Sequence, residues 1–195
     1  MNTPRIELTP FTITHARNRN YVMWLNDAQV LRYLGRPDYH HGVTLRDCER
    51  YFEDLTTDRN VSFFAVVLDG DRFVGTGKLR KVVTAGSDTG VVDVGLMVGD
   101  RSCWGLGIGS RVISLLSDHA FQSWSSRKLV AGMYAGNQAC VRAFLKGGFH
   151  IEGQLQAHIW DPKLEQFDDL VLMGRFSDRS RTIHLKSHTE PRTDQ

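Results

Sequence analysis

The chain has 195 residues and a formal net charge of +2, with 24 Lys and Arg residues against 22 Asp and Glu residues. This length fits one domain with a sizeable core, and the balanced charge argues against a general polyanion binder, so we expect no nucleic-acid partner. Three cysteines without a CxxC pair, no apolar run of membrane-spanning length and no signal peptide favour a cytoplasmic protein without a disulfide framework, a metal site or a membrane partner.

The first 60 residues predict one strand followed by helices. Residues Arg5 to Thr12 alternate apolar and polar side chains, as in an edge strand. Helical spacing of apolar residues follows over Thr14 to Asn26, and Asp27 is placed to cap a short second helix. A third helical pattern, Thr44 to Leu55, begins with a capping box in which Asp47 takes the place of Glu.

The rest of the chain predicts strands that alternate with two more helices. Apolar runs bounded by turn residues indicate strands at residues 61–68, 72–83, 91–98, 128–134, 149–160 and 167–176. Helices are expected from near Ser110 and from Asn137. This order indicates an α/β protein of the α+β type, with a mixed, mostly antiparallel sheet and helices on both faces. We expect a single domain over residues 1–176 and a polar, disordered tail over residues 177–195.

The strongest functional pattern is the segment Val91 to Ser110, which reads VVDVGLMVGDRSCWGLGIGS. A strand leads through glycines at positions 105, 107 and 109 into a helix. The first amides of a helix have no partner within it, and glycine lets the backbone approach a ligand closely, so this order favours a bound phosphate or pyrophosphate. The alternative is a tight turn without a ligand. The segment lacks the Gly-Lys-Ser/Thr ending of a P-loop and the third glycine of the dinucleotide fingerprint.

Two blocks of sequence resemble the GNAT superfamily of acyl-CoA N-acyltransferases. The first is WGLGIG, in which Trp104, Gly107 and Gly109 occupy the positions of the family's pyrophosphate-loop pattern R/Q-x-x-G-x-G/A. With tryptophan at the first position, the segment is similar to the branch of the family that includes ribosomal-protein N-terminal and amino-sugar acetyltransferases. The second block, residues 137–149, resembles N-x-x-A/S-x-x-x-Y-x-K-x-G-F and is followed by Glu152-Gly153.

The resemblance implies a GNAT fold with acetyl-CoA as co-substrate. In that fold two parallel strands splay apart, and the pantetheine arm of the cofactor lies in the gap and pairs with exposed strand amides. The residues that would contact the cofactor are Met97, Val98, Trp104, Gly105, Leu106, Gly107, Ile108, Gly109, Ser110, Asn137 and Lys146. Asn137 would also serve as a helix cap, and Lys146 either meets the adenosine phosphate or is solvated.

Acetyl transfer requires a base for the amine and a hydrogen-bond donor for the departing thiolate. Asp93 lies in an otherwise apolar strand, where the family often has Glu, and is the candidate base; the alternative is a structural or solvated carboxylate. Many family members place a tyrosine donor at the position of Phe144, which cannot donate. The replacement candidates are Cys140, which also fits as a small apolar residue on a helix face, and Tyr134.

The acceptor site is less clearly marked. Trp24 and Asn26 belong to a run that resembles acetyltransferases of nucleotide-linked amino sugars, although Asn26 also suits a helix cap. His158 and Asp169 fall near the cleft in the resembling pattern, and a histidine on a strand is equally explained by structure.

These residues together predict an N-acetyltransferase that transfers acetyl directly to a primary amine of a small molecule, with a nucleotide-linked amino sugar as one candidate. The alternatives are acetylation of a protein N-terminus, as in ribosomal-protein acetyltransferases, and a binding module that holds acyl-CoA without catalysis. The sequence does not determine the oligomeric state, and a homodimer is one option.

Overall fold

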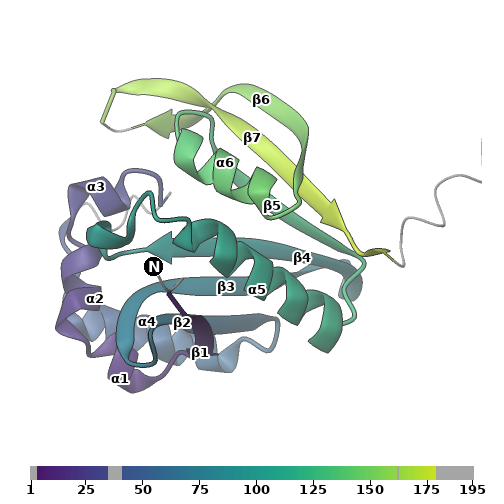
Figure 1. The fold of residues 1–195 in the computed structure, drawn as a ribbon. Coiled ribbons are helices and arrows are strands. Elements are labelled where there is room, and N and C mark those ends of the chain that lie inside the picture. Colours follow the sequence, from purple (N-terminus) through teal and green to yellow (C-terminus); the bar gives the residue numbers. More distant parts are fainter. Residues whose placement is uncertain (1–3, 35–40, 162, 179–195) are drawn as a thin grey trace, which may run out of the picture.

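The computed structural model describes residues 4–34, 41–161 and 163–178, and its elements are arranged as one sheet flanked by helices (Figure 1). Most of the predicted tail, residues 179–195, lies outside the described residues, so its disorder stays a prediction. In the part of the chain that is described, no helix is both long enough and apolar enough to cross a membrane.

Seven strands form one sheet in the order β1-β2-β3-β4-β5-β7-β6. The strands are β1 (Ile6–Pro10), β2 (Val61–Leu68), β3 (Arg72–Thr84), β4 (Ser87–Val98), β5 (Lys128–Tyr134), β6 (His150–Asp161) and β7 (Gln166–Phe176). Among these strands β4 and β5 alone run parallel, and they pair over three residues, with Val91 opposite Lys128 and Asp93 opposite Val130. The chain therefore has the predicted mixed, mostly antiparallel sheet with a splayed parallel pair.

Helices cover both faces of the sheet, and each face has its own core. The helices are α1 (Ile13–Ala16), α2 (Arg19–Trp24), α3 (Ala28–Leu31), α4 (Leu45–Thr57), α5 (Ile108–Ser123) and α6 (Gln138–Lys146). The larger core joins α5 and α6 to one face and includes Leu116 and Phe144, which are fully buried. The smaller core joins α1 to α4 to the other face, where Tyr21 and Phe73 pack together.

The predicted helix over residues 14–26 is wrong in one respect, because the structure breaks it into α1 and α2. Asn18 accepts a hydrogen bond from the amide of Asn20 at 2.9 Å, so a new helix is capped where the first one ends. The other N-terminal caps are confirmed. Asp27 accepts from the amide of Gln29 at 2.8 Å, and Thr44 caps α4 in a capping box.

Two boundaries around the functional segment also differ from the prediction. Strand β4 begins at Ser87, before the predicted Val91, because Ala85 and Gly86 both have positive φ and form a two-residue turn that lets β3 and β4 pair at once. Helix α5 begins at Ile108, before Ser110, because Gly107 acts as its N-cap with a left-handed φ of 78°. The glycine-rich segment and the helix start are thus closer together than the sequence indicated.

Candidate active site

The segment before α5 leaves a row of backbone donors unused. Gly105 and Gly107 have φ values of 76° and 78°, a region that side-chain-bearing residues rarely adopt, and they turn the chain into the helix. Within the described residues, no backbone amide from positions 105–110 donates to another protein group, whereas the amide of Arg111 donates to the Gly107 carbonyl at 3.2 Å. Unpaired amides at the positive end of a helix dipole are suited to bind an anion.

A cavity of about 540 Å³ lies beside this helix start. Three basic side chains line it: Arg5 at the start of β1, Arg111 in the first turn of α5 and Lys146 at the end of α6. Arg5 pairs with Glu7 at 2.6 Å, but Arg111 and Lys146 make no ion pair with any described residue. Free amides and two uncompensated cations fit the phosphates of coenzyme A. Lys146 was predicted here, whereas Arg5 and Arg111 were missed, although Arg111 follows the glycine-rich segment directly.

The splay between β4 and β5 leaves one edge of β4 unpaired beyond Asp93. Successive residues of a strand direct their backbone groups to opposite edges, so only one of Met97 and Val98 can present its amide to the gap. The carbonyl of Val98 already accepts a hydrogen bond from Trp104 Nε1 at 2.7 Å. Trp104 therefore ties the glycine-rich segment to the end of the strand, a positioning role that its sequence position alone did not reveal.

Asp93 lies on β4 with its side chain on the sheet face opposite the core residues Val92 and Val94. It is solvent-exposed and makes no hydrogen bond or ion pair with a described residue. Partial desolvation raises the pKa of Asp93 above its ordinary value, although the nearby charges of Lys78 and Arg80 lower it. A carboxylate with free lone pairs and a raised pKa can take a proton from an amine.

The two candidate donors for the departing thiolate both stay protonated at neutral pH. Burial, together with the charges of Asp161 and Asp168, raises the pKa of Tyr134, whose hydroxyl donates to the Trp160 carbonyl at 3.3 Å. Burial raises the pKa of the Cys140 thiol to about 11. This value lies above the ordinary thiol value of about 8.5, so Cys140 can stabilise a departing thiolate by a hydrogen bond but not by complete proton transfer. Tyr134 could do so only after its hydroxyl gives up the bond to the Trp160 carbonyl.

Asn137 is the N-cap of α6, as its position in the sequence predicts. Its side-chain oxygen accepts a hydrogen bond from the amide of Cys140 at 3.2 Å. This bond fixes the first turn of α6, which carries Cys140. The cap leaves the amide nitrogen of Asn137 available to a ligand.

The predicted acceptor residues Trp24 and Asn26 are engaged in packing. Trp24 is buried, lies 5.1 Å from the ring of Phe73 and covers Gly99, where a Cβ atom would approach the indole to 2.2 Å. The Asn26 side chain accepts from the amide of Val43 at 2.9 Å and donates to the carbonyl of the same residue at 2.8 Å. Both residues hold the N-terminal helices together, which explains their presence without a ligand.

His158 and Asp169 lie on the β6–β7 hairpin, and the structure does not join them to Asp93. The carboxylate of Asp169 accepts from the amide of Ala157 at 2.7 Å and from Gln154 Nε2 at 2.6 Å, and these bonds hold its pKa below the ordinary range. Ala157 has a φ of 46° inside an irregular stretch of β6. Asp169 therefore stabilises this bulge, and His158 is an exposed neighbour of it.

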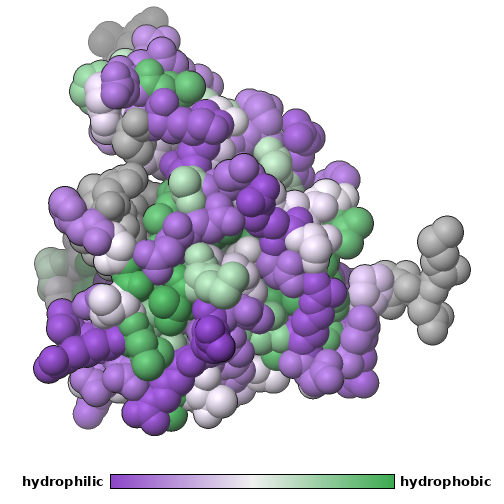
Figure 2. Space-filling model, turned by 90° about the vertical axis from the view of Figure 1, so that its left-hand side faces the viewer, coloured by the Kyte–Doolittle hydropathy of each residue, from purple (hydrophilic) through white to green (hydrophobic). Residues whose placement is uncertain are grey.

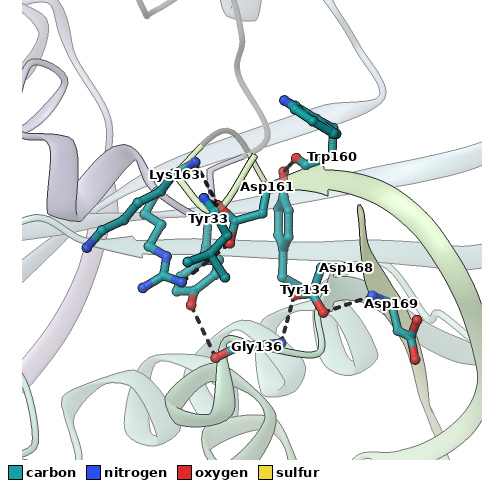
Figure 3. Close-up of polar contacts among 10 residues, drawn as sticks. Tyr33, Tyr134, Gly136, Trp160, Asp161, Lys163, Asp168 and Asp169 are labelled. Atoms are coloured by element: carbon teal, nitrogen blue, oxygen red, sulfur yellow. Dashed lines mark hydrogen bonds and ion pairs between the residues drawn. The ribbon is translucent and has the colours of Figure 1, made fainter. Parts of the chain in front are cut away.

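A polar cluster that the sequence analysis missed joins the segment just after α3 to the residues at and just after the end of β5 (Figure 3). The hydroxyl of Tyr33 donates to the Gly136 carbonyl at 3.2 Å, and its ring lies 5.4 Å from that of Tyr134. Asp168 accepts from the amide of Gly136 at 2.8 Å. The cluster thus brings two tyrosines and a carboxylate to one place.

A buried ion pair closes the same cluster. Arg32 contacts Asp161 at 3.4 Å, and Asp161 also accepts from the amides of Lys163 and Leu164. Asp161 is 1% exposed. The partners Arg32 and Asp161 are 129 positions apart in the chain, so no local pattern could have shown that they meet.

The described residues contain no group of three His, Cys, Asp or Glu side chains that could hold a metal ion.

A sequence model described as an acetyltransferase (GNAT) domain matches residues 5–150. The chain belongs to the GNAT acetyltransferase family. Acetyl-CoA is the co-substrate of this family, and the free amides and cations at the start of α5 fit its phosphates.

Several individual proteins are similar to this GNAT chain. The probable N-acetyltransferase YjcK of Bacillus subtilis is 29% identical over 103 residues. These residues are 53% of this chain and 55% of that protein, so the match spans about half the length of this curated relative. The crystal structure of spermidine N-acetyltransferase from Vibrio cholerae, in complex with CoA and spermine, has a TM-score of 0.76 and 15% identity, covering 90% of this chain and 98% of that one.

The ribosomal-protein-S5-alanine acetyltransferase from Vibrio fischeri has a TM-score of 0.72 and 15% identity, covering 91% of this chain and 95% of that chain. At these identities the two solved structures show that this chain has the GNAT fold.

Proposed function

We propose that this protein is an acetyl-CoA-dependent N-acetyltransferase that modifies the primary amine of a small molecule. The observation that supports this most directly is the row of free amides at positions 105–110, which lies beside a cavity with two unpaired cations. The gap between β4 and β5 leads from there toward Asp93. The phosphate-binding amides, the gap for the thioester arm and the base Asp93 therefore follow one another along β4.

In this proposal the pyrophosphate binds the free amides and the pantetheine arm lies in the gap. Asp93, directly or through a water molecule, takes a proton from the ammonium group of the acceptor, because an amine with a pKa of about 8 to 10 is mostly protonated at neutral pH. The amine nitrogen then attacks the thioester carbon, so the C–N bond forms and the C–S bond breaks. Cys140 stabilises the departing thiolate by a hydrogen bond, because the one hydroxyl hydrogen of the second candidate, Tyr134, is already donated to the Trp160 carbonyl.

The acceptor side favours a simple amine over a nucleotide-linked amino sugar. Trp24 and Asn26, on which the amino-sugar resemblance depends, are engaged in packing contacts. A second candidate acceptor is the α-amine of a protein, as the name of the Vibrio fischeri enzyme indicates for that protein. Its support here is the pair of exposed rings Trp160 and Phe167 on the β6–β7 hairpin, which lie 5.2 Å apart and could contact a peptide.

The test is thiol release from acetyl-CoA in the presence of alkylamines, polyamines, amino-sugar nucleotides and peptides, with acetylated products identified by mass spectrometry. We expect turnover with a small primary amine and none with the amino-sugar nucleotides. Calorimetry with coenzyme A is run in parallel. Binding of coenzyme A without turnover of any amine would favour a non-catalytic module, and turnover of peptides alone would favour the protein N-terminus.

A further inference from the structure

Strand β3 places two cations on the same face of the sheet as Asp93. Arg80 is the direct cross-strand partner of Asp93, and Lys78 lies two residues earlier on the same face. Residues directly opposite each other in an antiparallel pair have Cβ atoms about 4.5–5.5 Å apart, so opposite charges there are placed to pair. Asp93 nevertheless makes no hydrogen bond or ion pair with a described residue. The partners of the two cations explain why.

Helix α4 lies over this face of the sheet. Met97, which shares the face of Asp93 because it lies four residues further along β4, belongs to the core under α1 to α4. Helix α5 covers the other face (Figure 1). Side chains of α4 can therefore reach the β3 cations that neighbour Asp93.

Two residues of α4 and its C-cap hold these cations. Lys78 Nζ donates to the hydroxyl of Tyr51 at 3.2 Å and lies 5.6 Å from the centre of the Tyr51 ring. Arg80 Nη2 lies 3.6 Å from Oδ2 of Asp58, the C-cap residue of α4. Positions 51 and 58 are seven residues apart and share one side of the helix, as positions 78 and 80 share one face of the strand. The two contacts therefore follow from the periods of the helix and the strand.

The other described groups that face Asp93 carry no free charge. On β5 its partner is Val130, and the cation two residues earlier, Lys128, lies 2.6 Å from Glu152. On β4 itself the neighbours on this face are uncharged. Desolvation raises the pKa of Asp93 and the two β3 cations lower it, so their positions decide how strong a base Asp93 is.

The contacts between α4 and β3 are of the kind that a small change can redirect. The side chains of Arg80 and Asp58 are 50% and 32% exposed. Hydrophilic residues also cover much of the surface on the side of the molecule that carries α1 to α3 (Figure 2). Ion pairs in contact with water are weak and are screened by salt. Loss of its partner on α4 would therefore let a β3 cation move to Asp93 at little energetic cost.

We propose that Tyr51 and Asp58 are positioning residues that hold Lys78 and Arg80 away from Asp93. This inference rests on the proposed function, in which Asp93 is the general base. An unpaired carboxylate can bind the acceptor ammonium group and take its proton, whereas a carboxylate paired with Lys or Arg is a weaker base. Helix α4 thus keeps Asp93 reactive although it contributes no group of its own to the reaction.

The first experiment measures kcat against pH in Asp58→Asn and Tyr51→Phe, with saturating acetyl-CoA and the acceptor that is turned over fastest in the thiol-release assay. Each substitution frees one cation to pair with Asp93 and lower its pKa. The acidic limb should move to lower pH by about one unit in Asp58→Asn and about half a unit in Tyr51→Phe, which keeps the ring. At neutral pH kcat should fall about three- to tenfold, because the paired base is weaker.

A double-mutant cycle tests whether α4 acts through the cations. Arg80→Gln should move the acidic limb to higher pH, because one charge that lowers the pKa of Asp93 is lost. Asp58→Asn should then have no further effect in the Arg80→Gln background, and Tyr51→Phe should have none in the Lys78→Met background. A role of α4 in folding alone would give the same loss with and without the cation.

Asp88→Asn is the matched control. Its partner Lys81 is the next residue of β3 after the proposed site, and Lys81 Nζ lies 2.8 Å from Asp88 Oδ2. Lys81 faces the other side of the sheet, where its Nζ lies 5.6 Å from the ring of Trp124 at the larger core. The substitution thus removes a surface carboxylate and frees a β3 cation, as Asp58→Asn does, but on the wrong face. The acidic limb and kcat should stay unchanged.

The outcomes separate this inference from the proposed function. An acidic limb that stays in place in Asp58→Asn or Tyr51→Phe, or that moves equally after Arg80 or Lys78 has been replaced, would overturn the inference while acetyl transfer stood. Absence of turnover with every acceptor, or an Asp93→Asn variant with an unchanged pH profile, would instead overturn the proposed function or its choice of base, and this inference with it.

Discussion

The proposed cofactor half and the proposed acceptor half of this protein are built in different ways. The cofactor half uses backbone groups from consecutive positions, with the amides of residues 105–110 and the edge of β4 as its main features. The proposed acceptor half combines side chains from the segment after α3 and from β4, β5 and β7, such as Tyr33 and Asp168. Binding of the cofactor by backbone groups depends on the positions of glycines and of a helix start, which a short sequence motif reveals. The acceptor half depends instead on which side chains from distant segments meet.

Asp93→Asn should have the largest effect on turnover. It tests whether Asp93, which lies where the two halves meet, is the general base. Loss of a general base reduces kcat by about 10²- to 10³-fold, and the acidic limb of the pH–rate profile, which reports the raised pKa of Asp93, should disappear. Coenzyme A affinity should stay within about twofold, because the cofactor half is untouched. Unchanged turnover and an unchanged pH profile would show that Asp93 is not the base.

The same variant should be more stable than the unmodified protein at neutral pH. A carboxyl whose folded pKa is raised destabilises the fold once the pH exceeds the unfolded value of about 3.9, and this cost is complete above the folded pKa. Asn cannot ionise, so urea unfolding should show a gain at pH 7 that vanishes below about pH 4.

Gly107→Val should damage the cofactor half alone. A β-branched side chain resists the left-handed φ of 78°, so the helix start shifts and coenzyme A affinity should fall by about 100-fold or more. Gly86→Val is the control, because Gly86 has a φ of 79° with equally open surroundings on the β3–β4 turn. Both variants should lose similar stability, and calorimetry should find weakened binding in Gly107→Val only. Similar losses of affinity in both variants would contradict phosphate binding by the backbone amides of residues 105–110.

Asp161→Asn should damage the acceptor half alone. Burial by itself would raise the pKa of Asp161, but hydrogen bonds from Lys163, Leu164 and Arg32 hold it below the ordinary value. The variant leaves Arg32 without its charge partner, so the free energy of unfolding at pH 7 should fall by about 2–3 kcal/mol. Because a lowered carboxyl pKa stabilises the fold above about pH 3.9, the difference from the unmodified protein should shrink as pH falls through the folded pKa.

Amine KM should rise in Asp161→Asn, while coenzyme A affinity should not change. A loss of coenzyme A affinity comparable to the loss for the amine would mean that the two halves are not separable.

Arg111→Gln should have the smallest effect and refines the description of the cofactor half. Removing one unpaired cation from the cavity should weaken coenzyme A about five- to tenfold, with a smaller effect on dephospho-coenzyme A if the cation meets the 3′-phosphate. Arg142→Gln removes the same charge from the exposed surface of α6, outside the cavity lining, and serves as the control. Equal effects of both substitutions would indicate a general charge effect and no specific contact.

The sequence predicted the strands well because their signals are local. The bounds of β2 and β5 match the prediction, since β-branched runs between turn residues are seldom ambiguous. The helix over residues 14–26 was divided wrongly, because Asn18 caps a new helix through a side-chain bond that no periodicity reveals. The free amides at positions 105–110 were predicted from the glycines, and Lys146 does lie at the cavity.

The predicted acceptor residues show where sequence reasoning ends. Trp24 and Asn26 lie in a short resembling run, and the structure places their side chains against Gly99 and Val43. Their acceptor role stays a prediction.

The sequence by itself determined the fold class, the family and the glycine-rich start of α5, because glycine conformation, helix caps and strand periodicity act over a few neighbouring residues. Only the tertiary structure decided which face of the sheet Asp93 occupies, that Trp104 fastens the glycine-rich segment to Val98, and that Arg32 meets Asp161. The face of Asp93 depends on sheet register, the Trp104–Val98 bond depends on how the glycine-rich segment folds back on β4, and Arg32 and Asp161 are 129 positions apart, so short-range patterns carry no record of these contacts.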